Sequence, residues 1–154
     1  MDVKIQEIVE ETEVMDHWFG TILVSGVQLR LSFKAFCKIQ DADFFVALSY
    51  KQECAAPSQN HGFMHEYCNM VGGYIKNALD QQHIETKLNL PVVARENKSL
   101  FLNYGSEKNL ITDRWKLMVT DVSIYCMVTI EVIGDLKLSG ENLEFVDSGD
   151  INFF

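Results

Sequence analysis

The fold of this chain is decided by the stretch VQLRLSFKAFCKI, from Val27 to Ile39, in which apolar and polar residues alternate. Successive side chains of a β-strand point to opposite faces, so this period of two predicts a strand with one apolar and one solvated face. Only Phe36 is out of phase with the alternation. A sheet made of such strands must bury its apolar face under another layer, and a helical cover gives an α+β domain.

Further strands are predicted in three parts of the chain. DFFVALSY (43–50) is expected to pair with the first strand through a hairpin turn at QDAD. Two short strands are expected in NLPVVAREN (89–97) and SLFLNYG (99–105). Alternation returns from Trp115 to Val132, which is long enough for two strands or for one very long strand. Together these segments predict a long antiparallel sheet packed against two or so helices.

Helices are predicted in two places. Residues 3–19 carry apolar side chains at near-helical spacing among many acids, which indicates an amphipathic helix ending near Gly20. The polar segment 51–60 is interpreted as a loop. It leads into HGFMHEYCNMVGGYIKNAL, from His61 to Leu79, which predicts the helix that covers the sheet.

Length and charge limit the classes of protein to consider. With 154 residues, 47% of them hydrophobic, the chain is long enough to bury its own core. We expect a single domain at 1–138 and an acidic C-terminal tail at 139–154. The net charge of -9 opposes phosphate backbones and anionic bilayers, so nucleic-acid and membrane partners are not expected. The acidic N-terminal segment has no uninterrupted apolar run, which indicates a cytoplasmic protein.

The predicted helix from His61 divides into two arcs, because successive residues turn by about 100°. The buried arc is predicted to comprise Met64, Cys68, Val71, Ile75, Ala78 and Leu79. The solvent-facing arc is predicted to comprise Gly62, Glu66, Asn69, Gly73, Asn77 and Asp80, with Met70 at its margin. Glu66 and Asn69 are three residues apart, so their side chains are expected to be neighbours on the exposed surface.

Several familiar chemistries are disfavoured by the same helix. The letters HEYCN put Asn69 where the zinc motif H-E-x-x-H needs its second histidine. His61, His65 and Cys68 share helical spacing, but Cys68 is predicted to point inward as a small core residue. The four cysteines form no C-x-x-C pair, and VGGY lacks the lysine and hydroxyl of a phosphate-binding loop. No metal site is expected, and the cysteines are expected to be reduced and mostly structural.

A carboxylate beside a carboxamide suits a protein that assists a reaction in which another molecule supplies the electrophile. An amide both donates and accepts hydrogen bonds, so Asn69 can hold a water in line with an electrophile, while Glu66 can pair with a partner's lysine. Gly72 and Gly73 each cost a helix roughly 0.8–1 kcal/mol relative to alanine. Close packing of Gly72 on the sheet and close approach of a partner at Gly73 would offset that loss. The pattern fits a protein that assists a reaction on another protein.

The motif E-x-x-N-M-x-x-G, standing at Glu66, Asn69, Met70 and Gly73, is followed by Pro91 in PVVAREN. In this motif, this spacing and the α+β outline, the chain from about Glu66 to Val132 resembles the CheC/CheX/FliY phosphatases of bacterial chemotaxis. It carries a single E-x-x-N site with this extended pattern, which makes it most similar to CheX.

The resemblance implies a function. The expected substrate is the aspartyl phosphate of a CheY-like receiver domain, with Asn69 orienting the attacking water and Glu66 engaging the receiver's lysine. Met70, Gly73 and Asn77 are expected to contact this partner. The protein is expected to need no cofactor of its own, because the receiver supplies Mg²⁺, and to be a homodimer.

Two differences from the family pattern keep other readings open. Gly62 stands where relatives often have Asp or Ser, and segment 51–60 is a polar loop where relatives usually place a helix. A non-catalytic adaptor of a receiver domain, or a flagellar-switch component with the same fold, is the alternative function. A third reading makes Glu66 and Asn69 part of an ordinary solvated helix face.

Overall fold

The computed structural model describes residues 3–9, 12–50, 56–101 and 110–136. Its strands are β1 (Val3–Glu7), β2 (Thr12–Gly26), β3 (Leu29–Lys38), β4 (Thr86–Leu88), β5 (Val92–Phe101), β6 (Leu110–Val119) and β7 (Val122–Val132). Its helices are α1 (Ile39–Tyr50) and α2 (Pro57–Gln81). These elements form the predicted α+β architecture, whereas the expected boundary at residue 138 and the tail 139–154 lie outside the described residues.

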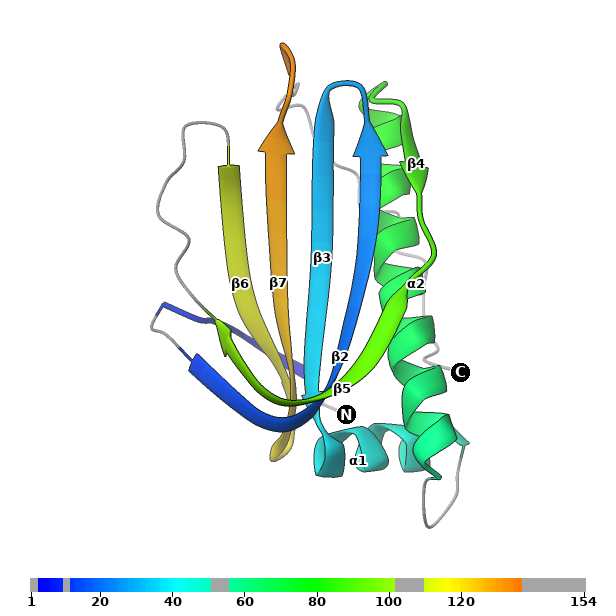
Figure 1. Ribbon diagram of the computed structural model, residues 1–154, viewed down its shortest axis with the longest axis vertical. Coiled ribbons are helices and arrows are strands. Elements are labelled where there is room, and N and C mark those ends of the chain that lie inside the picture. Colours follow the sequence, from blue (N-terminus) through cyan, green and yellow to red (C-terminus); the bar gives the residue numbers. More distant parts are fainter. Residues whose placement is uncertain (1–2, 10–11, 51–55, 102–109, 137–154) are drawn as a thin grey trace.

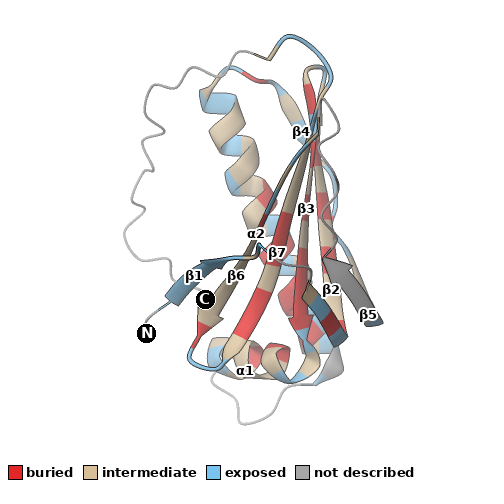
Figure 2. Ribbon diagram, turned by 90° about the vertical axis from the view of Figure 1, so that its left-hand side faces the viewer, coloured by how far each residue is buried: buried red, intermediate tan, exposed pale blue. Residues whose placement is uncertain are grey.

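The described strands form one antiparallel sheet in the order β1-β6-β7-β3-β2-β4, and β5 also pairs with β2 (Figure 1). β2 is the longest of these strands. Its first part pairs with β5 and its last residues pair with β4, while β3 lies along its other edge. α2 runs along one face of the sheet, and α1 crosses the end of the sheet near the start of α2 (Figure 2).

The main core lies between the sheet and α2. Ile22, Val24 and Phe33 of the sheet are at most 1% exposed, and so are Met64 and Cys68 of α2. The inward direction predicted for Cys68 is therefore confirmed, and burial raises the pKa of its thiol to about 12. The apolar face of β3 and the apolar arc of α2 thus pack together in one core, as the sequence predicted.

A second apolar cluster lies on the opposite face of the sheet. Val14, Phe36 and Met127 are buried there, and Phe19 and Tyr125 pack against them. The rings of Phe19 and Phe36 have their centroids 5.1 Å apart. Phe36 is out of phase in the β3 pattern because its side chain points to this second face. Near the end of β3 that face is also apolar and carries the cluster around Val14 and Met127.

The helix predicted for residues 3–19 is wrong, because this segment contributes β1 and the first part of β2. Ile5, one of the residues that suggested helical spacing, is 74% exposed. Val14 and His17 are the buried residues, and Asp16 between them has a left-handed backbone with φ of 40°. The apolar residues Ile5, Val9 and Met15, whose spacing suggested a helix, are all exposed, so that spacing marks no buried face.

The strand predicted for residues 43–50 is also wrong, because these residues belong to α1 and QDAD lies in its first part. Ala42 and Val46 are four residues apart and both are fully buried, so one face of the helix enters the core. The carboxylate of Asp41 accepts a hydrogen bond of 3.0 Å from the backbone N–H of Ser123. The apolar residues of this segment fit the period of a strand as well as that of a helix. The contact between Asp41 and Ser123, which the sequence does not show, favours the helix.

α1 also supplies a helix ahead of the motif helix, so the predicted absence of such a helix is wrong. α2 begins at Pro57 and not near His61, so part of the 51–60 segment is helical. The side-chain amide of Asn60 donates a hydrogen bond of 2.6 Å to Asp43, which joins the two helices.

The later strands agree more closely with the sequence pattern. The two short strands predicted after Asn89 form a single strand, β5, up to Phe101, and residues 102–105 lie outside the described part. The segment Trp115–Val132 divides into two strands, with Thr120 in the turn at φ of 55°. β4 was not predicted, because three residues are too few to show a period.

Candidate functional site

The candidate site lies on α2, which is anchored at its start and along its length. The backbone N–H of Ala56 donates to Oε1 of Gln59 at 2.7 Å, which closes the first turn. Further along, a Cβ placed on Gly72 would lie 2.9 Å from the Cδ1 atoms of Ile22 and Leu88. The side chains of Ile22 and Leu88 pack directly against the backbone at Gly72, so the predicted close packing of Gly72 on the sheet is confirmed.

Glu66 and Asn69 emerge from α2 as the sequence predicted. Both residues are exposed, and they are three apart on a continuous helix, so their side chains leave the same side of α2. Neither side chain forms a hydrogen bond or ion pair with another residue in the described part of the chain. A carboxylate and a carboxamide are therefore both available to a partner.

Gly73 forms an open notch beside this pair. No heavy atom lies within 4 Å of the position that a Cβ on Gly73 would occupy, whereas Gly72 next to it is packed against the sheet. The two adjacent glycines therefore have different surroundings, which is what the sequence predicted. The notch lets another backbone or side chain approach α2 closely, four residues along from Asn69.

The other two residues predicted to bind a partner lie next to the notch. Asn77 is exposed and follows Gly73 by four, which extends the row of Asn69 and Gly73 along α2. Met70 is half-buried and packs against the main core, so only part of its side chain is available for contact. Glu66, Asn69, Gly73 and Asn77 thus form a continuous solvent-facing strip on α2.

One flank of this strip carries residues that the sequence did not bring together. Trp18 of β2 packs edge-on against His61 of α2, with ring centroids 6.1 Å apart and planes at 82°. His61 in turn stacks on His65, at 6.5 Å. Arg95 of β5 is the register partner of Trp18 in the sheet and is exposed. Only the pairing of β2 with β5 places Arg95 next to α2, so periodicity alone gave no signal for it.

The two histidines had been considered as metal ligands with Cys68. Cys68 is fully buried in the main core, whereas His61 is exposed on α2. No group of three His, Cys, Asp or Glu residues in the described ranges is arranged to hold a metal ion. In the same ranges, no helix is long and apolar enough to cross a bilayer.

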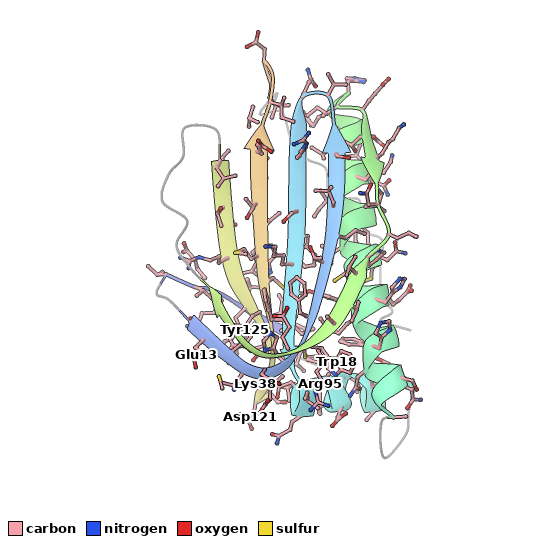
Figure 3. The ribbon with its side chains drawn as sticks, in the orientation of Figure 1. Glu13, Trp18, Lys38, Arg95, Asp121 and Tyr125 are labelled. Carbon is pink, nitrogen blue, oxygen red and sulfur yellow. The ribbon has the colours of Figure 1, made fainter. Side chains whose placement is uncertain are left out.

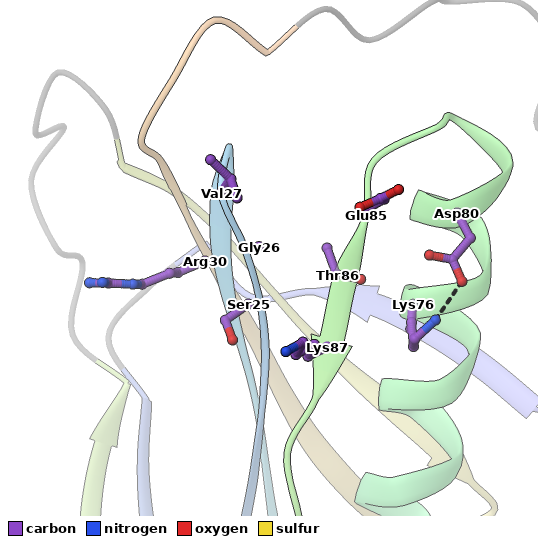
Figure 4. A pocket seen from close by; sticks show the side chains of 9 residues that line it. All are labelled: Ser25, Gly26, Val27, Arg30, Lys76, Asp80, Glu85, Thr86 and Lys87. Carbon is purple, nitrogen blue, oxygen red and sulfur yellow. Dashed lines mark hydrogen bonds and ion pairs between the residues drawn. The ribbon is translucent and has the colours of Figure 1, made fainter.

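A hollow lies near the end of α2, farther along the helix than Glu66 and Asn69. It has a volume of about 610 Å³ and is lined by Ser25, Gly26, Val27, Arg30, Lys76, Asp80, Glu85, Thr86 and Lys87 (Figure 4). It lies between the β2–β3 turn, β4 and the last turns of α2, and Lys76 forms an ion pair with Asp80 there. Glu66 and Asn69 are not among its lining residues.

The comparison with known proteins rests on structure. No family model and no curated protein sequence matches the chain. Among solved structures, a CheC-like chemotaxis protein from Shewanella oneidensis matches with a TM-score of 0.67 and 17% identity, covering 83% of this chain and 82% of that one. CheX from Vibrio vulnificus matches with a TM-score of 0.65 and 17% identity, covering 84% and 83%.

A third match is a complex. The structure of CheX with CheY, BeF3 and Mg²⁺ from Borrelia burgdorferi matches with a TM-score of 0.62 and 12% identity, covering 82% of this chain and 84% of that one. These likenesses define an α+β protein whose helices cover one face of an antiparallel sheet. The chain has the CheC/CheX fold, in agreement with the resemblance seen in its sequence.

Proposed function

We propose that this protein binds a phosphorylated CheY-like receiver domain through the strip on α2 and accelerates hydrolysis of its aspartyl phosphate. One observation carries the proposal: Glu66 and Asn69 are exposed, side by side and without a polar partner among the described residues, on the long helix of a CheC/CheX fold. The Borrelia complex supports the choice of partner, because a protein of the same fold is bound there to CheY.

In the proposed reaction, Asn69 positions the water. The oxygen of its carboxamide accepts a hydrogen bond from the water, and its NH₂ group donates one to an oxygen of the phosphoryl group. These two bonds hold the water in line with the phosphorus. Attack forms a bond from the water oxygen to phosphorus and breaks the bond from phosphorus to the aspartate oxygen. Inorganic phosphate and a free carboxylate result. Holding the water reduces the loss of entropy at the transition state.

Glu66 has a different proposed role, as a docking charge. Its exposed carboxylate pairs with the lysine of the receiver's phosphorylation site, which sets the distance between Asn69 and the phosphoryl group. Mg²⁺ and the phosphoryl group come with the receiver. Gly73 allows the receiver to approach α2 closely, and Met70 and Asn77 contact it on either side of the notch.

The assembly proposed for this function is a cytoplasmic homodimer. Among the described strands, β1 pairs only with β6, so the other edge of β1 is open. Open strand edges readily pair with a second chain. The apparent mass of the protein in solution, measured by light scattering, would test the dimer independently of activity.

The test of the function is the decay of a phosphorylated receiver. We expect the wild type to accelerate it, and Asn69→Ala to lower the acceleration by about 10²-fold, the usual effect of removing one preorganised hydrogen-bonding group. Glu66→Ala should weaken binding, while Gln81→Ala, an exposed change on the same helix, should change neither. Binding of the receiver with unchanged decay would favour the adaptor function, and neither binding nor accelerated decay would refute both.

A further inference from the structure

Arg95 occupies a defined place beside α2. It pairs in register with Trp18 across β5 and β2, and antiparallel register partners have side chains on the same face of the sheet. Trp18 packs against the main core and against His61, so this is the helical face. Figure 3 shows Trp18 and Arg95 together at the end of the sheet nearest the start of α2.

His61 and His65 lie one turn apart on α2, between Trp18 and the strip. The edge-on contact of Trp18 fixes the ring of His61, and His65 stacks on His61 with planes 20° apart. His65 precedes Asn69 by four residues, so the two are neighbours on α2. We call Arg95, His61 and His65 the basic flank, because all three are basic residue types.

Basic residues are the minority in this chain, which has 22 acidic and 13 basic residues. Arg95 is exposed and forms no ion pair with any other residue in the described ranges. An arginine keeps its charge at all physiological pH values. Arg95 is therefore a fixed positive charge with no ion-pair partner among the described residues, on the flank of α2 from which His65 leads to Asn69.

The proposed partner offers the complementary charge. A receiver that holds Mg²⁺ must do so with carboxylates as well as with its phosphoryl group, since Mg²⁺ is bound through such oxygen atoms. The inferred contact is with carboxylates at the rim of the phosphorylation site whose charge Mg²⁺ does not neutralise, beside the lysine that Glu66 engages. Contacts of opposite sign at two separate points fix the orientation of a docking protein and exclude the reversed orientation.

We infer that the basic flank binds carboxylates at the rim of the receiver's phosphorylation site and steers the receiver onto the strip. This inference rests on the proposed function and adds a second contact region to it, reaching from α2 to β5. Electrostatic contacts of this kind act chiefly on the association rate and lose strength as salt screens them. Arg95 is thus a positioning residue and takes no part in the chemistry.

The test measures association with a receiver activated by BeF3 and Mg²⁺, at low and at high salt. Arg95→Glu should slow association roughly tenfold at low salt and much less at high salt, because steering is screened. Lys87→Glu is the matched control, since it makes the same charge change at an exposed site on β4, near the far end of α2. It should change association only slightly, and circular dichroism should show both variants folded.

Turnover provides a second measurement. Arg95→Glu should raise KM and leave kcat at saturating receiver unchanged, whereas a structural defect would lower kcat as well. The double variant His61→Gln/His65→Gln should weaken binding in the same direction. Equal association rates for Arg95→Glu and Lys87→Glu would overturn the inference while leaving the proposed function intact. A wild type that binds no activated receiver would overturn both.

Discussion

Gly73→Ala should make the protein more stable and less active. No heavy atom lies within 4 Å of a Cβ at this position, so the new methyl group meets nothing in the protein. Alanine is better than glycine in a helix interior by roughly 0.8–1 kcal/mol, and no packing penalty offsets that gain here. For a chain of this size, the change corresponds to a rise in Tm of roughly 2–4 °C.

Gly72→Ala is the matched control, because it makes the same chemical change one residue earlier. Its Cβ would lie 2.9 Å from Cδ1 of Ile22 and of Leu88, so the gain in helix propensity is opposed by overpacking. Overpacking typically costs about 1–3 kcal/mol, and terminal methyl groups can move. We therefore expect this variant to lie between unchanged stability and a loss of about 2 kcal/mol, once the propensity gain is included.

Urea unfolding followed by circular dichroism measures the stabilities, and receiver dephosphorylation measures the function. The added methyl of Gly73→Ala should hinder close approach of the receiver and raise KM. A variant less stable than the wild type would refute the reading of Gly73 as an open position. Higher stability with undiminished turnover would instead remove Gly73 from the docking surface.

Three further outcomes follow from buried groups. Burial lowers the pKa of His17 more than nearby Glu96 raises it. As the pH falls, His17 is therefore protonated in the unfolded chain before it is protonated in the folded protein. Stability should therefore fall as the pH drops below about 6.5, and His17→Gln should reduce that slope in urea titrations between about pH 7.5 and 5.5. A Cβ on Gly20 would lie 2.6 Å from Sγ of Cys68, so Gly20→Ala should cost about 1–3 kcal/mol, and adding Cys68→Ala should recover part of it in a double-mutant cycle. Burial raises the thiol pKa of Cys68 and Cys126 to about 12, so both should resist a thiol reagent at about pH 8 until the protein unfolds; rapid labelling would contradict their burial.

The sequence predicted best those elements whose apolar residues follow one period over most of their length, with Phe36 and Met127 as exceptions on the second face. β3 and β7 alternate because one face of each lies on the main core along most of its length. α2 keeps a helical period because the sheet covers a single side of it. Glu66, Asn69 and Gly73 could be assigned to its free side from this pattern alone.

The failures have local physical causes. The left-handed backbone at Asp16 shifts the alternation of β2, so that Val14 and His17 both become buried. In α1, two adjacent phenylalanines, Phe44 and Phe45, fit a strand as well as a helix, and the contact of Asp41 with Ser123 is invisible in the sequence. Short local windows cannot represent interactions of this kind.

The surroundings of the site were less predictable than the site itself. The basic flank depends on pairing between β2 and β5, two strands that are far apart along the chain. Trp18 links it to α2 through a ring contact that no sequence period indicates. A surface built by sheet pairing becomes visible only when the topology is known.

The place of β1 at one edge of the sheet has a consequence for how the protein is made. Val3 pairs with Val119, so the first described strand meets its neighbour, β6, only after most of the polypeptide has left the ribosome. At about 5–20 residues per second, synthesis of the 116 residues that follow Val3 up to Val119 takes roughly 6–23 seconds, during which the N-terminal segment has no partner strand. During that interval its apolar side chains remain available to chaperones, and closure of this distant pairing is expected to be a late and slow step of folding.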